Sequence, residues 1–343
     1  MNNTLSKDFP FVSIIMPVRN EAEFIEESLA AVLEQDYPPK QMEVIVVNGM
    51  SDDGTKAIVE KMIIKKIQEG KAGPDIFVLD NPSCIVPVAL NIGLIKAKGD
   101  VIIRVDGHST IALDYVRRCV ETLLDTGAEC VGGLQYPVAK SLAGRAVALA
   151  ITTPFGVGNA KFRYREKAGW VDTVYLGAYW RKVFEKNGNF DEELVRNQDD
   201  EFNFRLLQSG GKIWLDLSIR SEYYCRSSLT GLWRQYFQYG FWKVKVIQKR
   251  GAVPSWRSLV PPFFVLCIAI GGLLSLFAHN SLSLLITVAA YGMVNLCVSI
   301  WLAFKKSWKA LFLLPLIFSI IHVAYGTGFL CGIVKRKKYS YKT

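Results

Sequence analysis

Short hydrophobic runs alternate with amphipathic segments along the first part of the chain. Strands are predicted at 11–16, 44–47, 76–79 and 101–105, because these runs are rich in β-branched residues. Helices are predicted between them, the first at about 19–34, the second after residue 55 and the third at about 86–98. Strands and helices that alternate at this spacing favour an α/β fold with a mostly parallel, doubly wound sheet. In such a sheet, the polar residues that follow each strand gather at the carboxyl edge, where ligands bind.

The hydrophobic pattern changes after residue 256. Residues 260–278, 282–304 and 310–334 form three runs with few charges, each near the length of about 20 residues that a bilayer requires. We therefore expect four parts along the chain. They are a cytoplasmic domain over 1–225, amphipathic interfacial helices over 226–258, a transmembrane region over 259–334 and a basic tail over 335–343.

Charges at the ends of the hydrophobic runs predict the orientation of the spans. Arg257 precedes the first run, and Lys305, Lys306 and Lys309 follow the second. By the positive-inside rule, the chain crosses outward and returns, and its large N-terminal part lies in the cytoplasm. The third run places the basic tail outside if it crosses once, whereas Pro315 and several glycines leave room for a re-entrant hairpin. A multi-pass protein of the cell inner membrane is the expectation.

Aromatic and basic residues interleave over 229–250. Helices of this composition lie in the headgroup plane, here with Trp233, Tyr236, Phe237 and Trp242 dipping toward the lipid tails. Stacking on nucleic acid is the competing interpretation, and it also agrees with the formal net charge of +10. Because the segment directly precedes the hydrophobic runs, membrane lipids are the predicted partner and nucleic acid is not.

Missing patterns disfavour several classes of protein. The seven cysteines include no C-x-x-C pair, so reduced thiols in the cytosol fit better than a zinc site or disulfides. Neither G-x-G-x-x-G nor G-x-x-x-x-G-K-[ST] follows a predicted strand, which argues against a dinucleotide enzyme and a P-loop ATPase. No cleavable signal sequence is expected, because the first apolar run is short and reads as a strand.

Asp106-Gly107-His108 follows the fourth predicted strand. A carboxylate and an imidazole side by side at the carboxyl edge of a sheet form half of a divalent metal site. Taken alone, the three residues are more typical of a turn cap followed by a solvated histidine.

Four stretches resemble, in order, the successive signatures of family 2 glycosyltransferases: 14–21, 46–55, 89–93 and 99–108. The resemblance covers roughly residues 11–250. It implies a GT-A nucleotide-sugar-binding fold, a UDP-sugar donor, a divalent metal (Mn²⁺ or Mg²⁺) and inversion at the anomeric carbon. The D-x-H sequence is similar to the membrane-anchored branch that builds exopolysaccharide repeat units such as succinoglycan. A lipid-linked saccharide is therefore the implied acceptor.

The same resemblance assigns the donor site. Asp106 corresponds to the first carboxylate of the D-x-D motif, and His108 stands where the last aspartate usually lies, so both are implied metal ligands. Asn48 is a second departure, because an aspartate is usual there, and it affects selectivity for the base. The implied donor-binding residues are Pro17, Arg19, Glu21, Asn48, Asp53, Asn91 and Asp106.

Residues 196–207 resemble the family's E-D-x-E helix start, in which Asp199 takes the place of the catalytic base. The reaction needs a carboxylate that accepts the proton of the attacking hydroxyl. Asp200 is the rival for this role. On a purely structural interpretation, the acidic residues cap the helix and complement its dipole.

Basic residues further along the chain are candidates for contacts with the acceptor or its diphosphate. Lys161, Arg163 and Arg165 have the guanidinium and ammonium groups that bind phosphate oxygens, although a solvated basic loop explains them equally well. Arg234 and Gln235 lie where related synthases carry a Q-x-x-R-W element, which is incomplete here.

The sequence thus predicts a metal-dependent inverting glycosyltransferase of polysaccharide biosynthesis. The alternative is a non-catalytic membrane partner that senses a UDP-sugar or scaffolds an assembly complex. A transporter is disfavoured because the spans are few and carry no charged residue beyond His322. A processive synthase is disfavoured because three spans scarcely enclose a polymer channel. The sugar, the linkage and the oligomeric state stay open.

Overall fold

The structure, a computed structural model, describes residues 9–70, 72–139, 141–225, 228–253 and 255–335. Contacts divide the chain into two units. The first comprises 1–136 and 165–223, and the second comprises 137–164 and 224–343.

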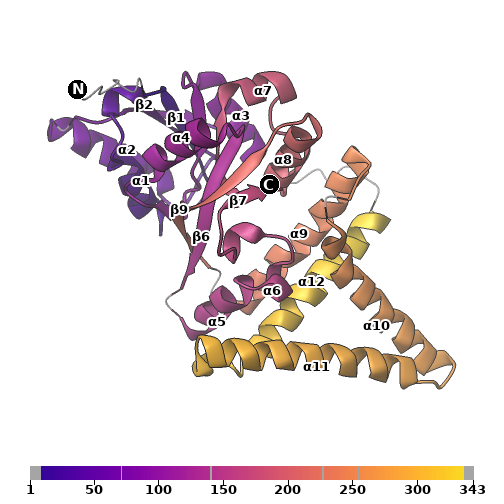
Figure 1. Ribbon diagram of the computed structural model, residues 1–343. Helices are drawn as coiled ribbons and strands as arrows, with labels where there is room; N and C mark the ends of the chain where they lie inside the picture. Colours follow the sequence, from indigo (N-terminus) through magenta and orange to yellow (C-terminus); the bar gives the residue numbers. More distant parts are fainter. Residues whose placement is uncertain (1–8, 71, 140, 226–227, 254, 336–343) are drawn as a thin grey trace, which may run out of the picture. The chain divides into compact units, whose positions relative to one another are not determined.

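A mixed sheet of nine strands forms the framework of the first unit (Figure 1). Its order is β3-β2-β1-β4-β8-β6-β9-β5, with β7 paired to β9. The strands are β1 (Val12–Val18), β2 (Met42–Asn48), β3 (Asp75–Asp80), β4 (Val101–Arg104), β5 (Ser109–Ile111), β6 (Cys130–Val138), β7 (Gly169–Val171), β8 (Tyr175–Trp180) and β9 (Ile213–Tyr224). Its helices are α1 (Ile25–Leu33), α2 (Thr55–Gln68), α3 (Val86–Lys96), α4 (Tyr115–Thr126), α7 (Arg181–Asn187) and α8 (Gln198–Gln208).

The predicted α/β class is confirmed, and the parallel arrangement holds for β3, β2, β1 and β4. Beyond β4 the expectation of a mostly parallel sheet was wrong. β8 runs antiparallel to both β4 and β6, and β5 and β7 run antiparallel to β9. Antiparallel neighbours do not need the helical crossover that a parallel pair requires, so the regular strand–helix alternation of the first hundred residues does not extend to them.

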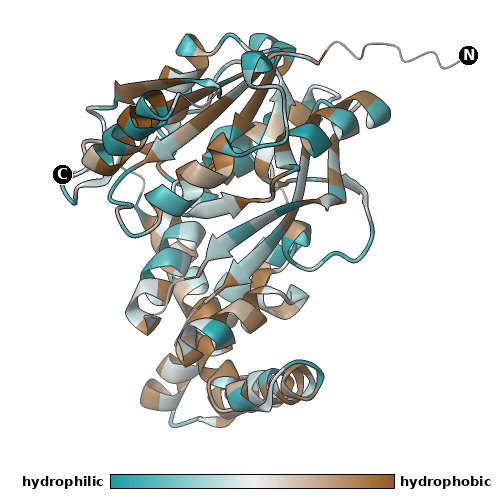
Figure 2. Cartoon of the chain, turned by 90° about the vertical axis from the view of Figure 1, so that its left-hand side faces the viewer, coloured by the Kyte–Doolittle hydropathy of each residue, from teal (hydrophilic) through white to brown (hydrophobic). Residues whose placement is uncertain are grey.

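Burial explains why β1 and β2 read as continuous hydrophobic runs. Every residue of both strands is buried, as is typical of central parallel strands that are covered on two faces. Ile25, Leu29 and Val32 of α1 pack into the same core as alternate residues of β1 and β2. In Figure 2 several strands of the sheet are largely in the hydrophobic colour, beside helices that also carry hydrophilic residues.

Strand register brings three loops to the carboxyl edge of the sheet. Val18 at the end of β1 pairs with Asn48 at the end of β2, and Ile15 pairs with Arg104 at the end of β4. The backbone N–H of Val105 donates to the carbonyl of Ile15 at 3.0 Å, so the pairing with β1 continues to the residue before Asp106. The segments that follow these strands hold the candidate site.

The second unit is helical. Its helices are α5 (Leu142–Ile151), α6 (Pro154–Val157), α9 (Leu229–Arg250), α10 (Val260–Phe277), α11 (Leu282–Lys305) and α12 (Leu314–Val334). Residues 137–164 fall in this unit, whereas the sequence predicted them to be part of the first domain. The reason is that the apolar face of α5, including Ala146 and Ala150, joins one core with residues of α12 such as Ile317 and Phe318.

Helices α9 and α12 lie side by side in close contact (Figure 1). A Cβ atom on Gly240 of α9 would collide with the carbonyl oxygen of Tyr325, and one on Gly328 of α12 would collide with that of Phe237. Small residues at a helix contact allow backbones to approach this closely. Residues 229–250 thus form one helix packed on α12, and Trp242 lies buried in the unit.

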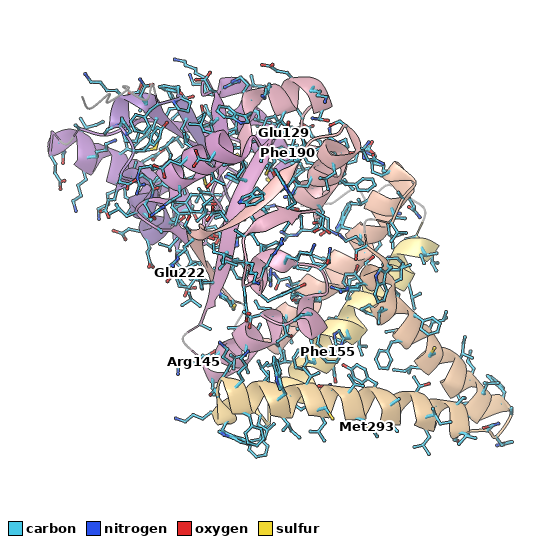
Figure 3. All side chains as sticks on the ribbon, viewed as in Figure 1. Glu129, Arg145, Phe155, Phe190, Glu222 and Met293 are labelled. Atoms are coloured by element: carbon cyan, nitrogen blue, oxygen red, sulfur yellow. The ribbon has the colours of Figure 1, made fainter. Side chains whose placement is uncertain are left out.

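Three helical segments of the described chain are long and apolar enough to cross a membrane: Trp256–Phe277, Leu282–Lys305 and Leu314–Val334. Large exposed apolar side chains cover α10 and α11, for example Met293 (Figure 3), which is 68% exposed. Between 314 and 334 the structure has one unbroken helix with Pro315 in its first turn, so it has no hairpin there. Residues 336–343 of the predicted basic tail lie outside the described residues.

A polar network links α6, α11 and α12. Nε2 of His322 donates to the carbonyl oxygen of Phe155 at 2.7 Å, because a carbonyl can only accept. Its Nδ1 therefore accepts from the hydroxyl of Tyr291 at 2.9 Å. The amide of Asn295 donates to the carbonyl of Pro315 at 3.0 Å. These hydrogen bonds fix how the three helices meet.

We expect His322→Leu to destabilise the second unit by about 1–3 kcal/mol, because it leaves the Phe155 carbonyl and the Tyr291 hydroxyl without this partner in a buried place. Thermal unfolding in detergent micelles measures the loss. His279→Asn is the matched control, because His279 is exposed and asparagine tolerates its positive φ of 50°. If the two variants unfold at the same midpoint temperature, the hydrogen bonds of His322 do not stabilise the unit.

Candidate active site

Hydrogen bonds tie the loop after β1 to the loop after β2. The carboxylate of Asp53 accepts from the backbone N–H groups of Ala22 at 2.9 Å and Thr55 at 3.0 Å. The hydroxyl of Thr55 accepts from the N–H of Glu21 at 2.9 Å. The N–H of Asn20 donates to the Ser51 hydroxyl at 3.1 Å. The two loops are therefore held together along one side of the site, and Asp53 accepts two of the hydrogen bonds that fix them.

Other residues predicted to bind the donor are held by protein contacts. Nη1 of Arg19 donates to the carbonyl of Cys84 at 3.0 Å. Asn48 is 3% exposed, and its amide donates to Asp80 at 3.3 Å while its oxygen accepts from the N–H of Ser51 at 3.2 Å. The side chain of Asn48 thus joins β2 to β3 and to its own loop.

Two more of these residues lie in different surroundings. Pro17 pairs with Val47 inside the sheet. The amide of Asn91 on α3 donates to the carbonyl of Phe190 at 2.9 Å and to Glu192 at 2.8 Å. Asn91 therefore ties α3 to residues 190–192, and its role in donor binding stays a prediction.

Arg104, Asp106 and Asp199 form the charged centre of the site. Nε and Nη2 of Arg104 donate to the two carboxylate oxygens of Asp106 at 2.7 and 3.1 Å. Nη1 of the same guanidinium lies 3.8 Å from Oδ2 of Asp199, which comes from the first turn of α8. One arginine therefore lies between the predicted metal ligand and the predicted base.

The surroundings shift the pKa values of the two carboxyl groups in opposite directions. Burial by itself raises the pKa of Asp106, but the positive charge and hydrogen bonds of Arg104, together with His108 and Arg196, outweigh it, so the pKa lies below its usual range. Burial also raises the pKa of Asp199, and here Arg104 does not outweigh burial and the nearby Asp200. A raised pKa suits a group that accepts a proton.

His108 is held by Glu21. Nδ1 of His108 lies 2.9 Å from Oε1 of Glu21, and its ring meets Tyr223 edge to face at 5.6 Å. With the Nδ1 proton directed at the carboxylate, the lone pair of the imidazole lies on Nε2. Glu21, one of the predicted donor-binding residues, thus contacts the predicted metal ligand in this structure.

The candidate metal-binding side chains fit a divalent cation that is bound jointly by the protein and a substrate. Among the described residues, no group of three or more His, Cys, Asp or Glu side chains converges as a complete metal site. Asp106 and His108 provide one carboxylate and one imidazole, a set suited to Mn²⁺. Ions of this kind are commonly held by one or two protein side chains together with substrate phosphates. The residues present fit that arrangement.

The predicted acceptor residues are divided between the two units. Lys161 and Arg163 lie in a 3₁₀ turn of the second unit, which also holds Arg234 and Gln235 on α9. Arg165 belongs to the first unit, where its Nη1 donates to the carbonyl of Trp170 at 2.9 Å. Their contacts with an acceptor stay predictions.

Arg104 was not among the site residues predicted from the sequence. A usable signal was present, because Arg104 precedes Asp106 by two residues, and an extended chain that continues past a strand keeps such side chains on the same face. The charge at the end of a hydrophobic strand also needs a partner if the strand is buried.

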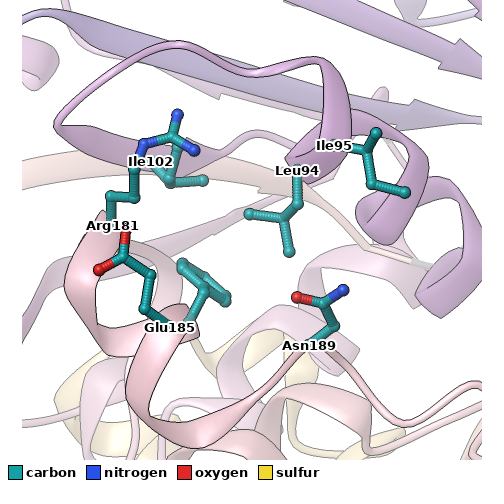
Figure 4. Close-up of a pocket in the computed structure, with 7 residues that line it drawn as sticks. Leu94, Ile95, Ile102, Arg181, Glu185 and Asn189 are labelled. Carbon is teal, nitrogen blue, oxygen red and sulfur yellow. The ribbon is translucent and has the colours of Figure 1, made fainter.

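A separate cavity of about 180 Å³ lies between α3 and α7 (Figure 4). Its lining includes Leu94, Ile102, Arg181 and Glu185. Ile102 lies near the start of β4, whereas Asp106 follows its end, and none of the predicted site residues lines this cavity.

Comparison with known proteins identifies the family. Residues 13–188 match the model of the family described as Glycosyl transferase family 2. The succinoglycan biosynthesis protein ExoA of Rhizobium meliloti is 30% identical over 318 residues, which cover 92% of this chain and 93% of that protein. The chain belongs to glycosyl transferase family 2.

A second relative is an enzyme of Methanococcus voltae. It is named dolichyl N-acetyl-alpha-D-glucosaminyl phosphate 3-beta-D-2,3-diacetamido-2,3-dideoxy-beta-D-glucuronosyltransferase. It is 28% identical over 334 residues, which cover 95% of this chain and 98% of that protein.

Solved structures share the fold. The mannosyltransferase PcManGT of Pyrobaculum calidifontis, in complex with GDP-Man and Mn²⁺, matches with a TM-score of 0.56 at 19% identity, over 92% of this chain and 87% of that one. Residues 1–349 of TarS from S. aureus match with a TM-score of 0.52 at 18% identity, over 95% of this chain and 92% of that one. The predicted GT-A fold is confirmed.

Proposed function

We propose that this protein transfers a sugar from a UDP-sugar to a lipid-linked saccharide at the cytoplasmic face of the inner membrane, with inversion at the anomeric carbon. The observation that carries the proposal is the convergence of Asp106, Arg104 and Asp199 at the carboxyl edge of a family 2 glycosyltransferase sheet. The name of ExoA supports a role in polysaccharide biosynthesis, and that of the M. voltae enzyme supports an acceptor carried on a lipid. Three helices able to cross a membrane agree with such an acceptor.

The chemistry follows from the positions of the side chains. Asp199 accepts the proton of the acceptor hydroxyl while that oxygen attacks the anomeric carbon and the bond from this carbon to the diphosphate breaks. Asp106 and His108 would hold a divalent cation, which would supply positive charge for the departing diphosphate. The loops after β1 and β2, which Asp53 joins, hold the nucleotide so that the reacting atoms stay aligned.

A donor panel tests the function. The purified full-length protein in lipid nanodiscs is incubated with lipid-linked saccharides, Mn²⁺ and single nucleotide sugars, including UDP-glucose, UDP-GlcNAc and GDP-mannose. Mass spectrometry of the extracted lipids is expected to show an acceptor longer by one sugar, with release of UDP. Transfer from GDP-mannose alone would refute the UDP-sugar donor. Binding of UDP-sugars without any transfer or hydrolysis would support the non-catalytic sensing or scaffolding role instead.

The raised pKa of Asp199 predicts the acid side of the pH profile. The base works only when it is deprotonated, so kcat/KM falls as the pH drops through the pKa of Asp199. Because that pKa is raised, we expect the fall to begin at a higher pH than for an ordinary aspartate, whose pKa is about 4. Rates measured from pH 4 to 8 at saturating Mn²⁺ check this. A fall centred at or below pH 4 would contradict it.

A further inference from the structure

Arg104 is the last residue of β4, and its side chain is only 15% exposed. The guanidinium uses one edge for both oxygens of Asp106, at 2.7 and 3.1 Å, and directs Nη1 toward Asp199 at 3.8 Å. A planar guanidinium with five N–H donors is suited to holding two carboxylates in fixed directions, which an ammonium group does less well.

The pairing of Arg104 with Asp106 is local, because the two residues are two apart at the end of β4 and the chain stays hydrogen-bonded to β1 through Val105. Asp199 reaches the site from α8, far along the chain. Without a cation between them, the two carboxylates would repel each other in a site that is partly shielded from water. Arg104 therefore sets the charge of this centre before any ligand binds.

We propose that Arg104 is a positioning residue for sugar transfer, which fixes Asp106 and Asp199 relative to each other and makes binding of Mn²⁺ depend on the donor's diphosphate. The second part follows from charge. Arg104 already neutralises one carboxylate, so the protein alone attracts a cation weakly, and the diphosphate must add the missing negative charge and ligands. The proposal rests on the proposed roles of Asp106 and Asp199.

The proposal predicts two effects of Arg104→Met in opposite directions. Loss of the positive charge is expected to tighten binding of Mn²⁺ alone by about tenfold, because Asp106 and Asp199 are then both unneutralised. Loss of the fixed geometry is expected to lower kcat by about 100-fold, with a smaller change in the KM for the donor. A variant that was merely less stable would lose activity without binding Mn²⁺ more tightly.

Electron paramagnetic resonance of free Mn²⁺, measured without nucleotide, gives the metal affinity, and steady-state rates give kcat and KM. Arg118→Met is the matched control, because Arg118 pairs with Asp114 on the surface and has a side chain that is 41% exposed. Arg104→Lys keeps the charge but not the planar group. We expect it to bind Mn²⁺ as the wild type does and to retain an intermediate kcat.

An affinity for Mn²⁺ and a kcat in Arg104→Met that both equal those of Arg118→Met would overturn the proposal. If Arg104→Met does not fold, wild-type kcat and KM in Arg104→Lys would overturn the positioning role, and a lowered kcat with unchanged metal affinity would support it. The metal measurement requires no donor, so it tests Arg104 even if the protein transfers none of the sugars offered. If the wild type transfers sugar, failure of the Arg104 proposal leaves the proposed function intact.

Discussion

Replacing Asp199 by asparagine is expected to lower sugar transfer by about 1000-fold while UDP binding stays within a few-fold of the wild type. The amide has nearly the shape of the carboxylate but cannot accept the proton of the attacking hydroxyl. Asp199 lies 3.8 Å from Arg104 and has no direct contact with Asp106 among the ion pairs and hydrogen bonds of the described residues, so the nucleotide site should persist. Single-turnover rates and calorimetry with UDP and Mn²⁺ measure the two quantities.

Asp200→Asn is the matched control for this experiment. It removes one carboxylate from the same helix turn, and the N–H of Asp200 still donates to Oδ1 of Asp199 at 2.9 Å because that hydrogen bond uses the backbone. We expect transfer near the wild-type rate. If Asp199→Asn is active and Asp200→Asn is inactive, the catalytic base is Asp200 and not Asp199. Loss of UDP binding in Asp199→Asn would indicate a disturbed site rather than a missing base.

Much of the first half of the sheet could be predicted from the sequence, because local patterns determine it. β1, β2 and β4 are hydrophobic runs, and the loops that follow them carry the polar residues. The second half of the sheet depends on pairings between distant segments, such as Ile103 with Ala178. Such pairings produce no pattern of hydrophobic and polar residues in the sequence. The grouping of α5 with α12 is missed for the same reason, since an apolar helix does not indicate which core it joins.

The candidate site shows the same division. Asp106, His108 and Asp199 were identified by motif order, and the structure places Asp106 and Asp199 on either side of one guanidinium. Arg104 lies within the stretch 99–108, but the resemblance gives it no role, and its place between the two carboxylates is revealed only by its contacts with Asp106 and Asp199. The Glu21–His108 pair also joins loops that are far apart in sequence, so the choice of partner for the imidazole could not be read from spacing.

The second large effect is expected for His108→Ala. Removing one of the two proposed protein ligands should weaken Mn²⁺ binding in the presence of UDP by about 100-fold, because changes to groups that merely orient a ligand already cost about 10–100-fold. The preference for Mn²⁺ over Mg²⁺ should also fall, because imidazole binds Mn²⁺ better than Mg²⁺ and the remaining carboxylate suits both ions. Transfer rates across a series of concentrations of each metal give both quantities.

Glu21→Gln separates ligation by His108 from a role in ordering the loop. The amide still forms a hydrogen bond with Nδ1, so the ring keeps its place at 2.9 Å, but the negative charge that strengthens the imidazole as a ligand is lost. If His108 binds the metal, Glu21→Gln should weaken the binding of Mn²⁺ moderately, and His108→Ala should weaken it more. If His108 only orders the loop, His108→Ala should lower the rate equally with Mn²⁺ and Mg²⁺, and Glu21→Gln should leave the ratio of the two metals unchanged. An unaltered ratio in both variants would therefore remove His108 from the metal site and leave Asp106 as its one protein ligand.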